Sequence, residues 1–559
     1  MKHRYISKTA YLGIVIGFFI GLARAIYSIT DSGYVKQGMF RLILLCLQDN
    51  INKWVFFSFS GAILFSLIVV ALMRLKPVSR FLVGVFGKFK IGILGKYIAM
   101  AALVLVMPCI AVLNSGIFID RAFNPPKSPN IIWIVIDALR TDHLGCFGYE
   151  KDTSPFIDKF ASENISFKNA FSQESYTMAS TPSYFTSTYP ATHGVLYDSP
   201  KMDILDSKFL TIAEILRNAN YNTAAFVFNN HLKAKFNFGQ GFDLYDDDKE
   251  HPIFDLRSRK VKETAKKIYE KTEQYLKKNK IRPLFLYLHY IDVHMPYVPP
   301  PPYDKLFPPV GDKRSAFNIS QYDGEIRYTD DYIEKTLKML ENYNVNLSNS
   351  VVIITADHGE EFFDYHPGDE GGEKHGRTLY MEQIHVPLII ALPSGLFKRV
   401  KIGSYVGLID IVPTILDVLN MNEKECDQFQ GKSLMPVIKK ENHDSPFVYS
   451  GASHDRGVLI EGGFKYYLYE KHSKADERAF SVRPSNNYNY LFAEEIYNIG
   501  LDPKETKNLI NENEEKGVLL KLRDKLRALK EKFPLKKDNR SVLIDERTKE
   551  ALRSLGYLQ

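Results

Sequence analysis

Three apolar runs of this chain each end in acidic or imidazole side chains, and this feature most constrains the fold that the chain can adopt. The runs and the side chains that end them are NIIWIVI with Asp137, VVIITA with Asp357 and His358, and PLFLYLHYIDVHMPY with Asp292 and His294. Continuous apolar runs are typical of strands buried on both faces of a parallel sheet. In open sheets of this kind the carboxyl ends of the strands build the active site. We therefore expect a metal site, surrounded by substrate-binding groups, at one edge of such a sheet.

No single one of these side chains identifies a metal site. An aspartate directly after a strand, such as Asp137, also fits a helix N-cap. Within the third run we expect His289 to pack inside the strand and Asp292 to form a turn. The adjacent Asp357 and His358 are harder to explain structurally, because both side chains must find polar partners on one tight turn. The prediction of a metal site therefore rests on the combination of these side chains and not on any one of them.

Residues 1–120 hold the long, nearly uncharged runs of the chain. The runs at 9–29, 54–73 and 97–119 are each long enough to cross ~30 Å of hydrocarbon as a helix. Basic residues precede the first run and gather again between 74 and 96. Because basic loops stay on the cytoplasmic side, we expect a three-helix, multi-pass anchor in the cell membrane. The rest of the chain would then be extracytoplasmic.

Charge and cysteine content argue against two other classes of protein. The net charge is only +7 over 559 residues, and much of it lies beside the apolar runs, which speaks against a nucleic-acid partner. The four cysteines include no CxxC pair, so they indicate neither a disulfide framework nor a zinc–cysteine site. Cys146 and Cys426 are the two cysteines after residue 120, and the sequence leaves open whether they pair.

A series of motifs after residue 128 occurs in an order that is similar to that of a known enzyme family. The motifs are NIIWIVIDALRTDHLGCFGY, SPFIDKFASENISFKNAFSQESYT, YPATHGV, YDGEIRYTDDYI, IITADHGE, HGRTLYMEQIHVPLII, LIDIVPTILD, GKSLMP, EEIYNIGLDPKETKNL and LRSLGYL. Together they resemble the sulfatase family of the alkaline-phosphatase superfamily, which contains metal-dependent ester hydrolases and transferases. The resemblance implies an enzyme with an α/β fold, in which helices flank a mixed, mostly parallel sheet and a small antiparallel subdomain follows.

The same resemblance suggests the domain boundaries. We expect a catalytic domain at residues 128–435, the antiparallel subdomain at 436–510 and a helical tail at 511–559. In the tail, the segment VLLKLRDKLRALKEKF places four leucines on one stripe of a helix, Leu519, Leu522, Leu526 and Leu529. We expect this stripe to pack on its own domain.

The hydroxyl-rich segment SYTMASTPSYFTSTYPATHGV, residues 175–195, holds the position of the family's nucleophile. The family places a cysteine or serine there, which is converted to formylglycine, and its motif runs on to a Tyr-Pro pair. Matching STPS locally makes Ser180 the nucleophile, whereas matching backward from Tyr189 makes Thr177 the nucleophile. We prefer Thr177, because this alignment needs no deletion. A threonine cannot become formylglycine. With a threonine at the nucleophile position, the chain resembles the phosphoethanolamine transferases and lipoteichoic acid synthases, which form a phospho-threonine intermediate.

The resemblance also implies roles for the other site residues. By family position the ligands of a divalent metal ion would be Asp137, Thr177, Asp357 and His358. An imidazole among carboxylates favours Mn²⁺ or Zn²⁺ over Ca²⁺, and the ion would lower the pKa of the threonine hydroxyl. His294 and His375 match two family histidines, which bind the non-bridging oxygens or protonate the leaving group.

Two cations are candidates for substrate binding. They are Lys374 and Arg140, although Arg140 could equally face a helix. The sequence also departs from the family's pattern, because Thr181 replaces the motif arginine and Ala179 replaces the motif proline. Losing that arginine removes one cation from the anion site and weakens the case for ordinary sulfatase activity.

Three functions fit these features. The first is a membrane-anchored hydrolase or transferase that acts on phospho-esters of a membrane lipid or envelope polymer through a metal-activated Thr177. The second is a sulfuric ester hydrolase that acts on an extracytoplasmic sulfated substrate. The third is an inactive membrane scaffold, against which the intact Asp137, Asp357 and His358 argue. The sequence does not specify the oligomeric state.

Overall fold

The computed structural model describes most of the chain after residue 127. The described residues are 128–198, 201–247, 263–278, 283–311, 314–362, 375–376, 378–421, 427–441, 447–451, 456–469, 494–535 and 541–543. Contacts divide the chain into two units, Met1–Pro125 and Pro126–Gln559, and all of the described residues belong to the second. The three expected membrane spans lie outside the described residues. Within the described part, no helix is both long enough and apolar enough to cross a membrane.

The second unit is built on an eight-stranded sheet with the order β10-β2-β9-β8-β1-β7-β5-β6. Its strands are β1 (Asn130–Ile136), β2 (Ile165–Phe171), β5 (Asn222–Val227), β6 (Leu244–Asp246), β7 (Leu284–Tyr290), β8 (Ser350–Ala356), β9 (His385–Ala391) and β10 (Val400–Gly407). Strand β9 pairs antiparallel with both of its neighbours, and the other pairs are parallel. The expected mixed, mostly parallel sheet is therefore confirmed.

The register of the central strands brings the predicted site residues to the same end and the same face of the sheet. In β1, Trp133 pairs with Tyr287 of β7 and with Ile353 of β8, so the three strands run in step. Side chains alternate between the two faces of a strand. Asp137, four residues after Trp133, thus projects from the same face as Trp133, and so do His289 in β7 and Asp357 after β8.

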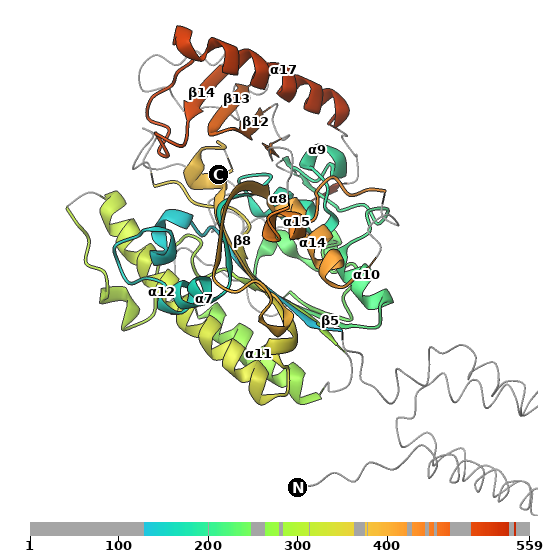
Figure 1. The fold of residues 1–559 in the computed structure, drawn as a ribbon. Helices are drawn as coiled ribbons and strands as arrows, with labels where there is room; N and C mark the ends of the chain where they lie inside the picture. The colour runs from blue at the N-terminus through green and yellow to red at the C-terminus, as the bar shows by residue number, and fades with distance from the viewer. Residues whose placement is uncertain are drawn as a thin grey trace, which may run out of the picture. The chain divides into compact units, whose positions relative to one another are not determined.

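Helices cover both faces of this sheet (Figure 1). One face carries α7 (Pro155–Glu163), α11 (Thr264–Lys278) and α12 (Arg314–Asn342), and the other carries α8 (Thr177–Thr186), α10 (Ile212–Asn218) and α14 (Ile411–Val418). Tyr184 and Phe185 of α8 pack against Trp133 at ring-centroid distances of 5.3 and 6.1 Å. This contact seats α8 on the face from which the acidic side chains project. Its first residue, Thr177, thereby reaches the ends of the strands.

The hydroxyl-rich sequence of α8 is explained by its burial. All ten residues of the helix are buried, so every hydroxyl needs a partner inside the protein. Ser183 and Thr186 donate to the carbonyls four residues earlier, at 3.0 and 2.6 Å. Short hydroxyl side chains can make this bond within a helix, and longer polar side chains cannot. The segment is thus a buried polar helix whose hydroxyls find hydrogen-bond partners inside the protein.

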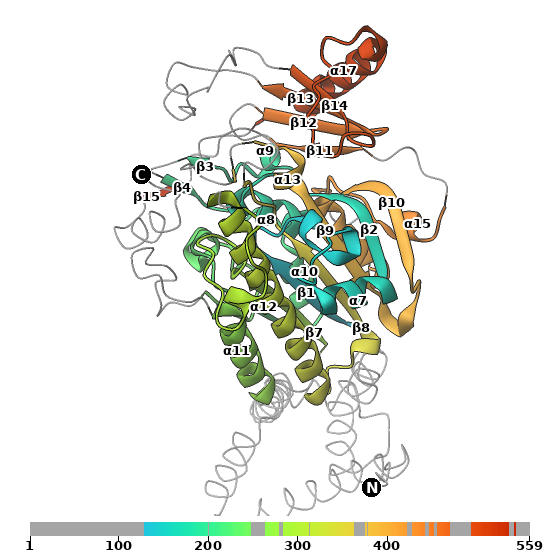
Figure 2. The same cartoon turned by 90° about the vertical axis from the view of Figure 1, so that its left-hand side faces the viewer.

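A four-stranded antiparallel sheet follows, with the order β11-β12-β13-β14. Its strands are β11 (Val448–Ser450), β12 (Arg456–Glu461), β13 (Phe464–Tyr469) and β14 (Glu494–Asn498), and helix α17 (Lys516–Lys532) covers it (Figure 2). The expected small antiparallel subdomain is confirmed. The leucine stripe of α17 is buried against Tyr449, Leu459 and Ile496 of this sheet, as expected. Among the cysteines, Cys146 is a free thiol, and Cys426 lies outside the described residues.

A buried ion pair ties the small sheet to the catalytic domain. Lys465 of β13 and Glu505 are 3.0 Å apart, and both side chains are fully buried. Glu505 also accepts a hydrogen bond from the backbone N–H of Met381 at 2.7 Å. Met381 begins α13 (Met381–Ile384), whose backbone carbonyls accept from Gly359 and Glu360 beside the site. The small sheet thus holds a segment that lies next to His358.

Asp330 of α12 links the stability of the fold to pH. Its carboxylate oxygens accept hydrogen bonds from the backbone N–H groups of Phe156 (2.9 Å) and Ile157 (2.8 Å) at the start of α7. Burial, together with the neighbouring carboxylates of Asp331 and Asp158, raises the pKa of Asp330 from 3.8 to about 7 in spite of these two donors. The folded state therefore binds this proton more tightly than the unfolded state does.

We expect the stabilising effect of Asp330 to be complete below its unfolded-state pKa of 3.8 and to be lost as the pH rises through about 7. Compared with the Asp330→Asn variant, which does not titrate, the wild-type protein should lose its advantage in thermal midpoint over this range. Scanning calorimetry of both proteins at several pH values measures the difference. An advantage that stays constant or grows with pH would contradict the prediction.

Candidate active site and metal centre

The structure brings the four predicted metal ligands together. The Oγ1 atom of Thr177 is 3.2 Å from Nε2 of His358. The same Nε2 atom lies 3.6 Å from Oδ1 of Asp137 and 3.6 Å from Oδ2 of Asp357. All four side chains are fully buried. They come from the ends of β1 and β8 and from the first turn of α8, which are far apart in the sequence.

A fifth residue, His289, belongs to the same cluster. Its Nε2 atom is 3.9 Å from Oδ2 of Asp137 and 3.8 Å from Oδ2 of Asp357. One ligand atom from each of these three residues lies within 4.8 Å of the other two. The expectation that His289 simply packs inside its strand is therefore corrected. The period of two along β7 held the missed signal, because His289 shares the sheet face of Tyr287.

The cluster fits a bound cation. Both ring nitrogens of His289 and the Oδ2 atom of Asp357 are buried and have no hydrogen-bond partner among the described residues. Leaving such groups unpaired in the interior is costly. Carboxylate oxygens and imidazole nitrogens are the donors that divalent transition metals take in proteins. A cation held by Asp137, His289, Asp357 and His358 would satisfy Oδ2 of Asp357 and Nε2 of His289, the ring nitrogen that faces both carboxylates.

The protonation states in the cluster suit metal binding. Nδ1 of His358 lies 2.7 Å from the carbonyl of Gly359, which can only accept, so this nitrogen carries the proton and Nε2 offers its lone pair to the cluster. Burial lowers the pKa of His358 to about 4, which keeps the ring neutral at physiological pH. Burial raises the pKa of Asp357, but His358, His289 and Thr177 outweigh it and hold that pKa well below its usual range.

Two alignments placed the nucleophile at Thr177 or at Ser180, and the geometry favours Thr177. The hydroxyl of Ser180 donates to the backbone carbonyl of Asp357 at 2.7 Å, which engages it in a structural bond. Thr177 is the first residue of α8, where the helix dipole stabilises negative charge. The amide of Asn229 lies 3.4 Å from the Thr177 hydroxyl and 2.6 Å from Oδ2 of Asp137. Asn229, which was not predicted, directs a donor at both atoms.

Two further imidazoles lie beyond His358, the ring that contacts Thr177. The ring centroids of His375 and His358 are 4.5 Å apart, and those of His375 and His294 are 4.8 Å apart. His294 and His375, predicted from separate motifs, are thus neighbours in the structure, and both are buried. Lys374, the predicted substrate-binding lysine, lies outside the described residues.

Arg140, the other predicted substrate-binding residue, is engaged elsewhere. Its Nε and Nη2 atoms bind the two carboxylate oxygens of Asp142 at 2.9 and 2.8 Å. Its guanidinium also lies over the ring of Phe362 at 5.5 Å. This paired geometry accounts for the burial of Arg140 without a substrate, and a role in binding stays a prediction.

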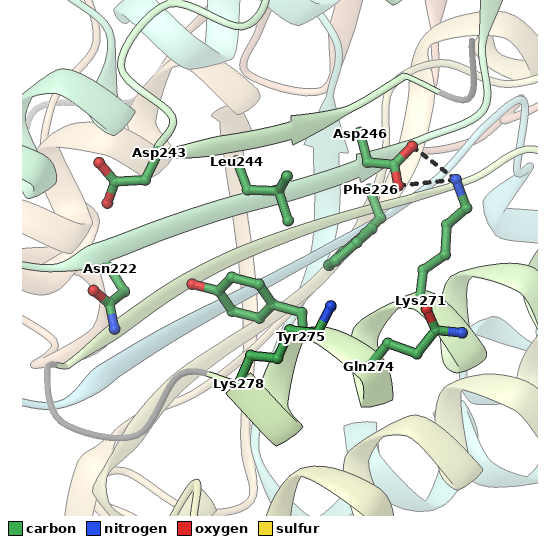
Figure 3. A pocket seen from close by; sticks show the side chains of 9 residues that line it. All are labelled: Asn222, Phe226, Asp243, Leu244, Asp246, Lys271, Gln274, Tyr275 and Lys278. Carbon is green, nitrogen blue, oxygen red and sulfur yellow. Dashed lines mark hydrogen bonds and ion pairs between the residues drawn. The ribbon is translucent and has the colours of Figure 1, made fainter. Parts of the chain in front are cut away.

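A separate pocket of about 400 Å³ lies between α11 and the edge strands β5 and β6 (Figure 3). Lys271 reaches across it to pair with Asp246, at 2.8 Å, and Tyr275 and Phe226 form its apolar side. None of the residues that line this pocket belongs to the cluster around Thr177. The candidate active site is therefore the buried cluster, and not this pocket.

Removing His289 should weaken metal binding, because its Nε2 atom faces both buried carboxylates. For His289→Ala we expect metal affinity to fall by at least about ten-fold. Metal content after dialysis against graded chelator concentrations measures it. His193→Asn is the matched control, since this equally buried imidazole bonds with Ser183 and the backbone of Val195 instead. Unchanged affinity in His289→Ala would show that His289 is no ligand.

Comparisons with known proteins agree with the geometry. The Sulfatase family model matches residues 129–421, more than half of the chain, and the model for the C-terminal part of N-sulphoglucosamine sulphohydrolase matches residues 370–532. An ulvan-active sulfatase of Formosa agariphila is 26% identical over 57% of this chain and 67% of its own length. An arylsulfatase of Clostridium perfringens is 23% identical over 69% of this chain and 91% of its own length.

Solved structures show the same fold. A phosphonate monoester hydrolase of Agrobacterium radiobacter superposes with a TM-score of 0.58 at 17% identity, over 72% of this chain and 96% of that one. A putative sulfatase of Bacteroides thetaiotaomicron superposes with a TM-score of 0.57 at 17% identity, over 75% and 96%. Together with the family models, these likenesses identify the chain as a member of the sulfatase family, in the alkaline-phosphatase-like superfamily of ester hydrolases.

Proposed function

We propose that this sulfatase-family hydrolase cleaves sulfate esters and that Thr177 is its nucleophile. One observation carries the proposal: the Thr177 hydroxyl lies 3.2 Å from Nε2 of His358, within a buried cluster of two carboxylates and two imidazoles. The curated relatives described above are named as sulfatases. They favour sulfate ester hydrolysis over the phospho-transfer that the threonine alone suggested.

The residues of the cluster divide the work between them. A bound divalent cation would polarise the ester and lower the pKa of the Thr177 hydroxyl. The α8 N-terminus and the Asn229 amide stabilise negative charge on the Thr177 oxygen. His294 and His375 lie close enough to each other to contact the same ester, as acid or as anion-binding groups.

The reaction would proceed in two steps through an ester of Thr177. The Thr177 oxygen bonds to sulfur as the bond to the leaving oxygen breaks, the alcohol leaves with a proton, and the Thr177 proton passes to solvent. Water then attacks the sulfur of the threonine ester, sulfate departs, and Thr177 recovers a proton. Because a threonine has one side-chain oxygen, this second step must break the bond between Thr177 and sulfur.

A phospho-ester is the second candidate substrate, and the nucleophile itself favours it. A plain hydroxyl attacks phosphorus in the threonine enzymes that the sequence resembles, and one solved structure of this fold is named a phosphonate monoester hydrolase. The reaction would follow the same two steps, with phosphorus in place of sulfur. An alcohol that replaced water in the second step would make the enzyme a transferase.

We further propose that the bound cation is Mn²⁺ or Zn²⁺. The cluster offers the imidazoles of His289 and His358 beside the carboxylates of Asp137 and Asp357. Imidazole nitrogen suits first-row transition metals, whereas Ca²⁺ prefers shells made of oxygen alone.

We also propose that residues 1–120 anchor the enzyme in the cell membrane with its catalytic domain outside the cytoplasm. The uncharged runs and the placement of basic residues support this topology. A lipid or envelope polymer would then be the substrate, and nucleic acid would not be a partner. Protease treatment of intact cells should cleave the catalytic domain; protection until the membrane is opened would contradict the proposed side.

Thr177→Ala should abolish turnover while the protein stays folded, because one small hydroxyl contributes little packing. We expect kcat to fall by at least about a thousand-fold. Rates with 4-nitrophenyl sulfate, 4-nitrophenyl phosphate, a phenylphosphonate ester and a phosphodiester, in wild type and variant, measure the effect and rank the substrate classes. Isotope label from sulfur or phosphorus should accumulate on Thr177 during turnover.

Ser180→Ala is the control for the other alignment. It removes one hydrogen bond to a backbone carbonyl and should cost about 1 kcal/mol of stability with most of the activity retained. If instead Thr177→Ala remains active and Ser180→Ala is inactive, the nucleophile is Ser180 and not Thr177. If the wild-type enzyme cleaves a phospho-ester faster than the sulfate ester, its function is phospho-ester hydrolysis, the second candidate.

A further inference from the structure

The turn that follows β8 and carries two of the proposed metal ligands lies directly against residues 379–384, the α13 segment. The N–H groups of Gly359 and Glu360 donate to the carbonyls of Gln383 and Glu382 at 2.8 and 3.0 Å. A Cβ atom on Gly359 would lie 2.0 Å from the carbonyl oxygen of Glu382, so any other residue at this position would force the two segments apart. The two backbones are therefore held together immediately after the ligands.

The peptide of Gly359 in turn orients a proposed metal ligand. Its carbonyl faces Nδ1 of His358 at 2.7 Å, which leaves Nε2 directed at the carboxylates of Asp137 and Asp357. Losing a group that holds a ligand through its other ring nitrogen typically lowers metal affinity by about 10- to 100-fold. The position of the α13 segment therefore bears on the metal centre, although this segment supplies none of the proposed ligands.

Glu505, which follows β14, holds the α13 segment near its start. Its Oε2 atom accepts a hydrogen bond from the backbone N–H of Met381 at 2.7 Å. Its Oε1 atom lies 2.9 Å from the hydroxyl of Tyr467, which also lies 3.0 Å from the carbonyl oxygen of Leu379. Lys465 pairs with the same carboxylate at 3.0 Å. One buried carboxylate thus joins the main chain of the α13 segment to two side chains of β13.

The backbone conformation of Glu505 would suit glycine better than glutamate. Its φ is 54°, in the left-handed region, where residues other than glycine are uncommon. The residue is only 1% exposed, so its carboxylate is not there to meet water. Strained positions of this kind persist where the surrounding contacts determine them. The contacts of the carboxylate, and not the turn itself, account for a glutamate at this position.

We propose that Glu505 is a positioning residue for the metal centre. By fixing the α13 segment, it sets the backbone against which the turn of Asp357 and His358 is held, and it thereby raises the affinity for the cation. This inference rests on the proposed function, which requires that cation. The small C-terminal sheet then contributes to metal binding through Lys465 and Tyr467, although it supplies no ligand.

Two variants that remove the same charge test the role of Glu505 as an acceptor. Glu505→Gln keeps a side-chain oxygen for the N–H of Met381, whereas Glu505→Leu has no acceptor, and Lys465 loses its ion pair with Glu505 in both. In the full-length protein we expect affinity for Mn²⁺ or Zn²⁺ to fall at least about ten-fold in Glu505→Leu and to stay near the wild-type value in Glu505→Gln. Chelator competition measures the affinities. Thermal unfolding of the metal-free proteins measures any loss of stability separately.

Two tyrosine variants test the same link without a change of charge, and they decide the matter if Glu505→Leu does not fold. Tyr467→Phe removes the hydroxyl beside Leu379 and Glu505. Metal affinity should fall by less than in Glu505→Leu, because the carboxylate still holds the α13 segment. Tyr497→Phe is the matched control: this tyrosine is also buried in the small sheet, but its hydroxyl bonds with Glu495 of its own strand at 3.1 Å. Its affinity should equal that of the wild type.

Unchanged metal affinity in Glu505→Leu and Tyr467→Phe would overturn the proposal, even if both variants lose stability. So would equal losses in Glu505→Gln and Glu505→Leu. If the wild type binds neither cation, the proposed metal centre fails, and hydrogen exchange still tests the positioning. The amides of Gly359 and Glu360 should exchange faster in Glu505→Leu than in Glu505→Gln. Equal exchange rates would show that Glu505 does not hold this turn.

Discussion

The structure depends on two buried carboxylates, those of Asp137 and Asp357, at the ends of adjacent parallel strands. Like charges in a dry interior repel, and leaving them unpaired would cost several kcal/mol. His289 and His358 are directed at them from two further positions, and a bound cation would supply the positive charge that balances the two carboxylates. The same four side chains therefore form the candidate metal-binding centre.

Helix α8 turns that centre into a site for chemistry. Its aromatic side chains pack on Trp133 and Tyr287, with one hydrogen bond between the hydroxyls of Tyr184 and Tyr287, and its first residue lies beside His358. A helix that began one turn earlier or later would present a different hydroxyl to His358. Packing of aromatic rings in the middle of α8 thus determines which hydroxyl, among the many in this segment, lies beside the metal-binding groups.

Membership of the sulfatase family does not by itself determine the chemistry of this chain. Thr181 stands where the family motif has an arginine, and its hydroxyl lies 3.0 Å from that of Tyr184 inside the core. The charge that such an arginine would bring is therefore absent from this helix. The start of α8, the Asn229 amide and the histidines are the groups beside Thr177 that would stabilise an anion, and Glu360 bonds with His375 and Tyr297 on two of the loops.

The sequence by itself predicted buried parallel strands that end in acidic and imidazole side chains, because apolar runs are local patterns. The family resemblance, and not a local pattern, supplied Thr177 and the set of Asp137, Asp357 and His358 as ligands. The sequence also indicated the buried stripe of α17, because helical spacing is local. Only the tertiary structure revealed His289 and Asn229, since their place depends on the register between β1, β7 and β5. It likewise showed that Arg140 pairs with Asp142 and that Glu360 faces His375. A local pattern can give the sheet face of a residue such as His289, but not which residues from other strands and loops lie next to it.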